Sequence, residues 1–174
     1  MIDIRDDIQA LFNRERSVAD FLALDGELVK QVVRSRRTLR LERGGRRFYL
    51  KLHYGVGWRE ILKNLLRLDA PVLGARDEYR AIGELERLGV DTMRVAAFGE
   101  QGLNPARRRS FLLTDAIEET QDLEHWLPGL YRPGDSAERL ALKRAVIAKV
   151  AWIARQLHGH GVNHRDFYLC HFRI

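Results

Sequence analysis

The first third of the chain carries two kinds of hydrophobic pattern, one helical and one alternating. Residues 7–24 place apolar side chains at helical spacing, which predicts a helix that ends before Gly26. Three β-prone runs follow, and they predict strands at 27–33, 37–42 and 48–53. The pair Gly44–Gly45 separates the last two runs, which is typical of a tight β-hairpin.

The middle of the chain changes to helices and then returns to strands. The stretch "WREILKNLLRL" (58–68) predicts an amphipathic helix with a basic polar side. A packed core position is the favoured interpretation of its apolar side, and the alternative is a helix that lies on an anionic membrane. A second helix is predicted from about Ala75 to Leu88, with Gly89 just past its C-terminus. Two further strands are predicted at 92–100 and 109–115.

The last third of the chain carries the longest helical pattern. An acidic, turn-rich connector follows residue 115, and Asp135 with Glu138 resembles a capping box at a helix start. An apolar stripe then predicts a long buried helix that stops at Gly159. The order of elements predicts an α+β protein with a five-stranded sheet, in which residues 1–115 form a first domain and residues 116–174 begin a second, helical one.

Composition and charge describe an ordinary globular protein with a preference for acidic partners. Apolar residues make up 45% and charged residues 31% of the 174 positions, and the net charge is +6. Phosphates, anionic lipids, nucleic acid or an acidic protein are all compatible with that charge. Cys170 is the only cysteine, the N-terminus lacks a signal-peptide pattern, and no apolar run approaches the about 20 residues of a membrane span, so a cytoplasmic protein is expected.

Three residues in a fixed chain order predict the chemistry. Lys51 lies in the middle of a predicted strand, Glu78 lies on the apolar stripe of the following helix, and Asp166 lies in "HRD" after the longest helix. A carboxylate on an apolar stripe favours a paired cation, which Lys51 would supply. Phosphoryl transfer needs such a cation near the phosphates and a carboxylate near the attacking hydroxyl, and kinases carry these groups in this order.

Each of these residues also has a purely structural interpretation. Lys51 is compatible with an exposed lysine on the wet face of a sheet, and Glu78 with a solvated acid in the first turn of a helix. Asp166 is compatible with a surface pair with Arg165 in a helix-terminal turn. The chain order of all three favours the kinase interpretation, in which Asp166 is the catalytic residue and Lys51 with Glu78 binds ATP.

Four strings of the sequence resemble the lipopolysaccharide core heptose-I kinase family of Gram-negative bacteria. They are "LKLHYGVGWREILKNL", "PVLGARDEYRAI", "LGVDTMRVAAFGEQGLNP" and "LHGHGVNHRDFYLCHF", and the resemblance extends over essentially the whole chain. It implies a protein-kinase-like fold, ATP and Mg²⁺ as cofactors, and phosphorylation of the first heptose of the inner core. By position, Asp166 resembles the family's catalytic aspartate, Lys51 its phosphate-binding lysine, and Glu78 the helix partner of that lysine.

The sequence departs from the kinase pattern in three places. No G-x-G-x-x-G precedes Lys51, and "VRSRR" (33–37) stands there instead, so backbone or arginine donors would have to hold phosphate. His171 occupies the usual position of a metal-binding asparagine, and the second metal-binding aspartate of the family would lie beyond Ile174. The metal ligands are therefore unknown, and the chain is expected to be a fragment that is inactive alone.

Two alternatives to the heptose kinase remain. One is another small-molecule kinase of the same fold, acting on Kdo or on an aminoglycoside. The other is a non-catalytic, basic kinase-like module that binds an acidic partner protein. The expected partners are the lipopolysaccharide core glycolipid, an acidic protein and peripherally the inner membrane, whereas nucleic acid is not expected, because the basic residues are not interleaved with aromatic ones on one sheet face.

Overall fold

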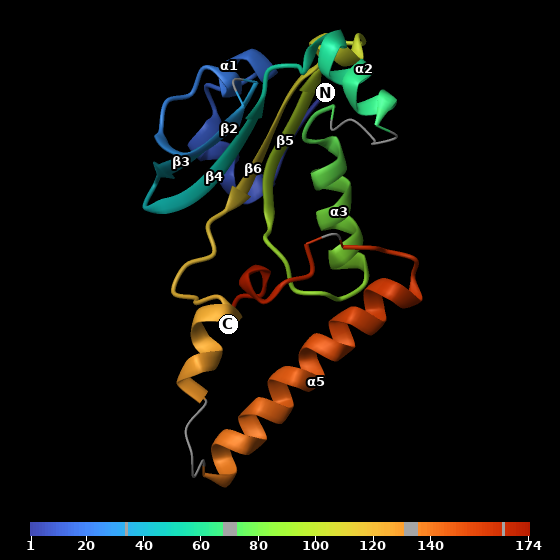
Figure 1. Ribbon diagram of the computed structural model, residues 1–174. Coiled ribbons are helices and arrows are strands. Elements are labelled where there is room, and N and C mark those ends of the chain that lie inside the picture. The colour runs from blue at the N-terminus through green and yellow to red at the C-terminus, as the bar shows by residue number, and fades with distance from the viewer. Residues whose placement is uncertain (34, 68–72, 131–135, 165) are drawn as a thin grey trace. The chain divides into compact units, whose positions relative to one another are not determined.

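The computed structural model of the protein describes residues 1–33, 35–67, 73–130, 136–164 and 166–174 (Figure 1). The chain divides into two compact units. The first unit contains residues 1–84 and 92–116, and the second contains residues 85–91 and 117–174. The division into a first domain at residues 1–115 and the beginning of a second at residues 116–174 stays a prediction.

A six-stranded antiparallel sheet forms the first unit. The strands are β1 (Ile2–Ile4), β2 (Glu27–Val33), β3 (Arg36–Arg43), β4 (Arg46–His53), β5 (Val95–Gln101) and β6 (Arg109–Asp115). Their spatial order is β1-β5-β6-β4-β3-β2, and every neighbouring pair is antiparallel. The prediction of five strands is therefore wrong by one: the three residues of β1 are too few to show alternation, and their pairing with β5 is long-range.

The predicted hairpin between β3 and β4 is confirmed. Arg43 pairs with Arg46, so the connection has two residues. Gly44 and Gly45 have φ angles of 57° and 72°, the left-handed values that a two-residue type I′ turn requires at both positions. Glycine adopts these angles without the steric cost that a Cβ would bring.

The single helix predicted for residues 7–24 is wrong. The structure has a 3-10 helix, η1 (Asp6–Phe12), and a separate short helix, α1 (Val18–Leu22). A capping box starts α1: Ser17 Oγ accepts from the Asp20 N–H at 3.2 Å, and the Asp20 carboxylate accepts from the Ser17 N–H at 2.8 Å. These local bonds satisfy helix-terminal donors in the middle of the predicted helix, which explains the break.

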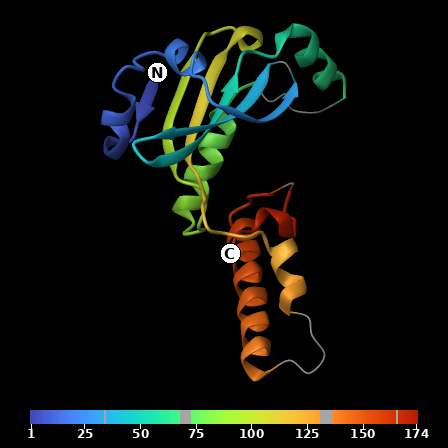
Figure 2. The same cartoon turned by 90° about the vertical axis from the view of Figure 1, so that its left-hand side faces the viewer.

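The two faces of the sheet have separate cores, because side chains alternate along each strand. Residues of η1 and α1 pack on one face against strand residues that include Phe48, Leu50, Leu52, Phe111 and Leu113. On the other face lies α3 (Arg76–Arg87), where Ala75, Ile82, Phe98 and Leu112 form a smaller cluster. Figure 2 shows α3, in green, on the side of the sheet opposite the blue N-terminal helices.

Two further helical segments complete the first unit. Helix α2 (Gly57–Leu66) follows β4, and a 3-10 turn, η2 (Pro105–Arg107), lies between β5 and β6. The helix predicted at 58–68 is confirmed as α2, although residue 68 lies outside the described residues. The prediction that its apolar side is packed is wrong, because Ile61 is the only apolar side chain of α2 that is buried among those the structure describes.

The second unit is helical. Its elements are α4 (Leu123–Trp126), η3 (Leu127–Leu130), α5 (Ala137–Gly159) and η4 (Leu169–His171). The predicted cap residue Asp135 lies outside the described residues, and Ser136 is the N-cap, with Oγ accepting from the Arg139 N–H at 3.4 Å. The predicted stop at Gly159 is confirmed, and Gly161 follows with a φ of 72°.

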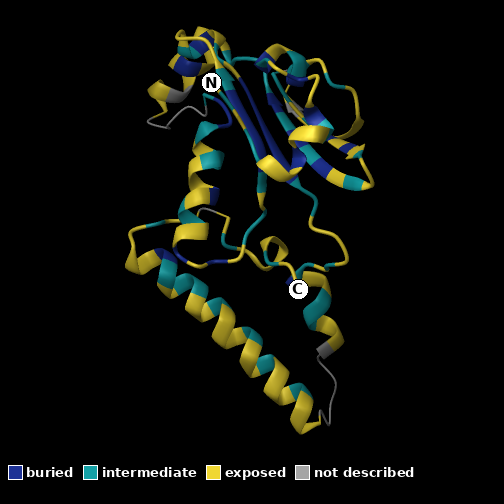
Figure 3. Ribbon diagram, turned by 180° about the vertical axis from the view of Figure 1, so that it is seen from behind, coloured by how far each residue is buried: buried dark blue, intermediate teal, exposed yellow. Residues whose placement is uncertain are grey.

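Helix α5 is much less buried than its apolar stripe predicts. Along this fully described helix Leu157 is the only buried residue, and it packs with Leu88 and Val90. Leu140 is 45% and Ile147 is 68% exposed. Figure 3 shows most of α5 in the colours of exposed and intermediate residues. The prediction of a buried helix therefore holds for its C-terminal turns alone.

Candidate active site

Lys51 lies in the middle of β4, on the face of the sheet that carries α3. Its strand neighbours Leu50 and Leu52 point to the opposite core, as the alternation predicts. In the register of the sheet Lys51 lies between Thr38 of β3 and Leu112 of β6. The central position of β4 fixes the backbone of Lys51 by hydrogen bonds on both sides.

Three groups of contacts hold the first turns of α3 against this face. Ser110 Oγ accepts from the Ala75 N–H at 2.9 Å, and both groups are buried. Arg76 makes a bidentate ion pair with Glu100 of β5, with N–O distances of 3.0 and 2.7 Å. The ring of Tyr79 stacks on Phe98 with a centroid distance of 4.3 Å. Because these anchors lie on both sides of Glu78 in sequence, they fix the backbone from which its side chain extends.

Glu78 forms the predicted ion pair with Lys51. Glu78 Oε1 accepts from the Lys51 ammonium, and the two side chains are 36% and 31% exposed. A lysine ammonium has three N–H donors, so a pairing with one carboxylate oxygen leaves it able to donate to an anionic ligand as well. The contact is thus confirmed, whereas the role of the pair in binding ATP stays a prediction.

His53 adds a neutral group to the same face. Burial, the largest cause, lowers the pKa of His53, and with the charges of Arg36 and Lys51 acting in the same direction and that of Glu78 opposing them, the pKa is about 4. Its Nδ1 is buried and has no hydrogen-bond partner within the part of the chain that the structure describes. The sequence places His53 two residues from Lys51 on this face. Its cross-strand neighbour, Arg36, is known only from the structure.

The segment 33–37, which stands where kinases have the glycine-rich loop, contains arginines with different neighbours. Arg36 pairs with His53 in the register of the sheet and so belongs to the end of β3 near Lys51. The guanidinium of Arg37 lies 5.6 Å from the centre of the Tyr54 ring and makes a cation–π contact with it. Arg34 lies outside the described residues. Among the described arginines of this loop, Arg36 is therefore the one placed toward the face of Lys51.

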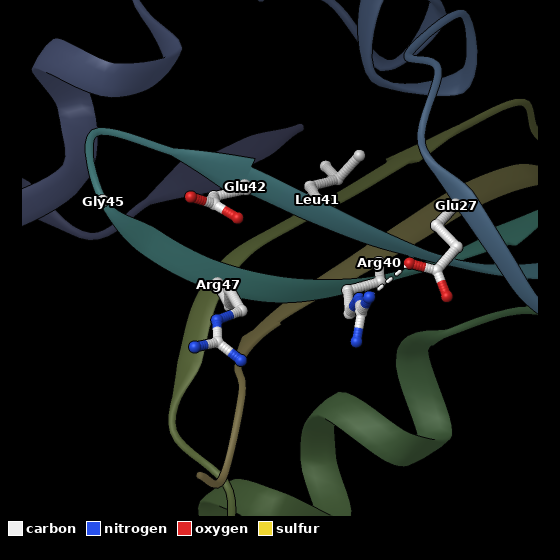
Figure 4. Close-up of a pocket in the computed structure, with 6 residues that line it drawn as sticks. All are labelled: Glu27, Arg40, Leu41, Glu42, Gly45 and Arg47. Atoms are coloured by element: carbon white, nitrogen blue, oxygen red, sulfur yellow. Dashed lines mark hydrogen bonds and ion pairs between the residues drawn. The ribbon is translucent and has the colours of Figure 1, made fainter.

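A groove lies along strands β2, β3 and β4. Its volume is about 380 Å³, and it is lined by Glu27, Arg40, Leu41, Glu42, Gly45 and Arg47 (Figure 4). Arg40 forms an ion pair with Glu27 of the neighbouring strand. The groove has charges of both signs, so its lining alone selects no particular ligand.

Asp166 belongs to the second unit, in the turn that follows α5. It is exposed, and its neighbour Arg165 lies outside the described residues. The loop around it is held by the Val162 N–H, which donates to the Leu157 carbonyl at 2.9 Å, and by an edge-to-face contact of Phe167 with Phe172 at 4.9 Å. The exposed carboxylate is accessible to a substrate hydroxyl, and its catalytic role stays a prediction.

The described residues do not provide a magnesium site. They contain no group of three His, Cys, Asp or Glu side chains able to hold a metal ion. His171, at the position of the expected asparagine, lies in η4 and is exposed. Magnesium prefers oxygen ligands in octahedral geometry, which an imidazole does not supply. No helix of the described parts is long and apolar enough to cross a membrane.

Comparison with known proteins identifies the family. Residues 19–174 match the profile of the "Lipopolysaccharide kinase (Kdo/WaaP) family". The whole chain is 41% identical to the lipopolysaccharide core heptose(I) kinase WaaP of Escherichia coli K12, and it covers 64% of that protein. It is 45% identical over 152 residues to the WaaP of Pseudomonas aeruginosa, which is 87% of this chain and 55% of that protein.

A solved structure described as "WaaP in complex with acyl carrier protein" has the same fold. It matches with a TM-score of 0.78 and 34% sequence identity, over 99% of this chain and 63% of that one. The chain thus spans between 55% and 64% of the length of these relatives. The profile match, the sequence identity over the whole of this chain and the shared protein-kinase-like α+β fold agree. The chain therefore belongs to the lipopolysaccharide kinase (Kdo/WaaP) family.

Proposed function

We propose that the protein transfers a phosphoryl group from ATP to the first heptose of the lipopolysaccharide inner core. The observation that carries this proposal is the partly exposed Lys51–Glu78 ion pair, which joins β4 to α3 in a chain of this kinase family. The names of the similar proteins from E. coli and P. aeruginosa support heptose as the acceptor. The proposed reaction takes place on the cytoplasmic side of the inner membrane.

Lys51 and Glu78 bind and orient the nucleotide in this proposal. The Lys51 ammonium donates hydrogen bonds to phosphate oxygens and offsets their negative charge. Glu78 holds the ammonium in place, so that less side-chain entropy is lost when ATP binds. Arg36 supplies a second cation at the end of the sheet where kinases carry the glycine-rich loop.

Asp166 is the proposed general base. Its carboxylate accepts the proton of the heptose hydroxyl as that oxygen forms a bond to the γ-phosphorus. The bond from the γ-phosphorus to the bridging oxygen breaks in the same reaction, and ADP leaves with that electron pair. Because the described residues do not fit a magnesium ion, no step is assigned to the metal that the family resemblance implies.

Substitutions at two of the proposed residues separate binding from chemistry. In the longest natural form of the chain, Lys51→Gln should weaken ATP binding by about tenfold to a hundredfold, the value of one charge-assisted hydrogen bond. Asp166→Asn should leave ATP binding intact and lower the transfer rate by about a hundredfold or more. Nucleotide titration and transfer of labelled phosphate to heptose-bearing core measure the two effects.

A matched control is Lys149→Gln, which removes another exposed lysine–carboxylate pair, with Asp91 at 3.1 Å. It should change neither ATP binding nor transfer. Wild-type transfer by Asp166→Asn would exclude this residue as the base, and unchanged ATP binding by Lys51→Gln would exclude the proposed nucleotide site.

Kdo is the second candidate acceptor, because the family profile covers both Kdo and heptose kinases. The two proposals differ only in the sugar that gains phosphate. Transfer assays with two acceptors, one with Kdo alone and one that also carries heptose I, distinguish them. Phosphate on the first acceptor would favour a Kdo kinase and contradict the heptose proposal.

We also propose that an acidic protein binds the chain, with acyl carrier protein as the candidate. The support is the net charge of +6 and the solved relative, which is described as a complex with that protein. Size-exclusion chromatography of the two purified proteins should show a complex that dissociates as salt screens the charges. Separate elution at low salt would contradict this partner.

A further inference from the structure

Helix α2 exposes most of its large apolar side chains to solvent. Trp58, Leu62 and Leu65 are each more than half exposed, at 54%, 56% and 54%, and Leu66 is 87% exposed. Ile61 is 6% exposed and holds the helix to the rest of the unit. An apolar helix side that does not pack on its own protein marks an interaction surface when its side chains are contiguous.

The angular positions of these residues make them contiguous. At about 100° per residue, Leu65, Trp58, Leu62 and Leu66 occupy an arc roughly 100° wide. Ile61 lies at one edge of this arc, and the cations Arg59 and Lys63 adjoin its other edge. Arg67 follows directly after the helix. An exposed apolar arc bordered by cations is the pattern of a helix that lies in a membrane interface.

The turn η2 extends this surface. The backbone around Gly55, just before α2, packs closely on η2: a Cβ on Gly55, which has a φ of 90°, would lie 2.9 Å from the Ala106 carbonyl oxygen. The loop that leads into η2 carries Leu103, which is 97% exposed. Exposed Arg107 and Arg109 follow it. Apolar and cationic side chains therefore continue from α2 onto its neighbouring segment.

We propose that α2 and the 102–109 loop dock on an anionic phospholipid bilayer. The apolar arc would enter the interface between headgroups and acyl chains, with the Trp58 ring at headgroup depth, while Arg59 and Lys63 contact lipid phosphates. A bilayer accepts exposed side chains at different depths, whereas a protein partner must offer a matching pocket for each. The docking surface does not depend on phosphoryl transfer, so its failure and that of the proposed reaction are distinguishable.

The fluorescence of Trp58 tests the proposal directly. A W126F/W152F variant keeps Trp58 as the single tryptophan. Mixed with vesicles of phosphatidylethanolamine and phosphatidylglycerol, it should shift its emission to the blue, and lipids with brominated acyl chains should quench it. Vesicles of phosphatidylcholine alone should give a weaker effect, because they lack the anionic lipid that the cations bind.

Two pairs of variants separate apolar from electrostatic docking. L62Q/L66Q should lower vesicle partitioning on the order of tenfold, and R59Q/K63Q should lower it by a similar factor. The matched controls lie on α5: L140Q/L142Q, with side chains 45% and 42% exposed, and R144Q/R155Q, at two other exposed cations. Both controls should bind vesicles like the wild type. Circular dichroism confirms that each variant is folded.

Three results would overturn the proposal. The first is no quenching of Trp58 by brominated lipid. The second is vesicle binding that L62Q/L66Q leaves unchanged, which would show non-specific adsorption of a basic protein. The third is a loss of acyl carrier protein binding in the α2 variants together with unchanged vesicle binding, which would assign this surface to an acidic protein instead.

Discussion

Lys51 and Glu78 form an ion pair whose importance lies in geometry more than in stability. Each side chain is about one third exposed, and pairs with such exposure contribute no more than about 1 kcal/mol to folding. Strand alternation and helical periodicity made the pair a candidate, and the kinase order of Lys51, Glu78 and Asp166 along the chain favoured it over the structural interpretations. The environment of His53 could not be predicted from the sequence, since it depends on which residue of β3 lies opposite.

His53 should make the protein less stable as the pH falls. Its pKa is about 4 in the folded protein and near 6.5 in an unfolded chain, so protons bind the unfolded state preferentially between these values. The stability present above about pH 6.5 is lost progressively toward pH 4, by at most about 3 kcal/mol. In urea titrations over this range, His53→Gln should give a flatter dependence of unfolding free energy on pH.

His125→Gln is the matched control. Its hydrogen bond with Asp122 raises the pKa of His125, so this histidine contributes stability that is present at low pH and lost as the pH rises through its folded pKa. Removing it should therefore not flatten the loss of stability toward low pH. If His53→Gln retained the full wild-type slope, the buried neutral state of His53 would be wrong.

At the scale of elements, the sequence predicted the strands and helices that carry a local hydrophobic pattern. The strands β2 to β6 and the helices α2, α3 and α5 carry alternation or helical periodicity over several residues. The short β1 and the division of residues 7–24 depend on pairing with β5 and on side-chain caps, which periodicity does not report. Burial was predicted least well, since an apolar stripe shows which side of α2 or α5 is apolar but not whether anything covers it.

One buried hydroxyl should contribute measurably to the position of α3. Ser110→Ala removes the acceptor for the Ala75 N–H and leaves that donor buried and unpaired, which costs about 1–3 kcal/mol. Because this bond anchors the helix that carries Glu78, the variant should also weaken ATP binding. Thermal unfolding and nucleotide titration measure the two effects.

Ser136→Ala is the control for this variant, because it also removes a serine acceptor at the start of a helix. The Ser136 bond is longer, at 3.4 Å, and exposed, so its loss should cost about 1 kcal/mol or less and leave ATP binding unchanged. Equal destabilisation by both variants would show that burial of the Ala75 N–H does not matter.

At the scale of the whole molecule, the two units have very different cores. The larger core of the first unit contains thirteen buried residues, among them five aromatic or leucine side chains of β4 and β6. The core of the second unit contains Leu88, Val90 and Leu157, with partly buried neighbours. Since apolar burial is the main stabilising term in folding, the second unit should open more easily than the first.

Hydrogen exchange should therefore divide the molecule along these cores. Backbone amides in the first half of α5, where Leu140 and Ile147 are exposed, should exchange at least about tenfold faster than those of β4 and β6. The turns of α5 around Leu157 should lie between these limits, because they pack on Leu88 and Val90. Peptide-resolved mass spectrometry measures all three regions in one experiment, so the comparison needs no external standard. Protection of the first half of α5 equal to that of β4 would mean that another surface covers this helix in solution, and exposure in the isolated chain would then not describe its working state.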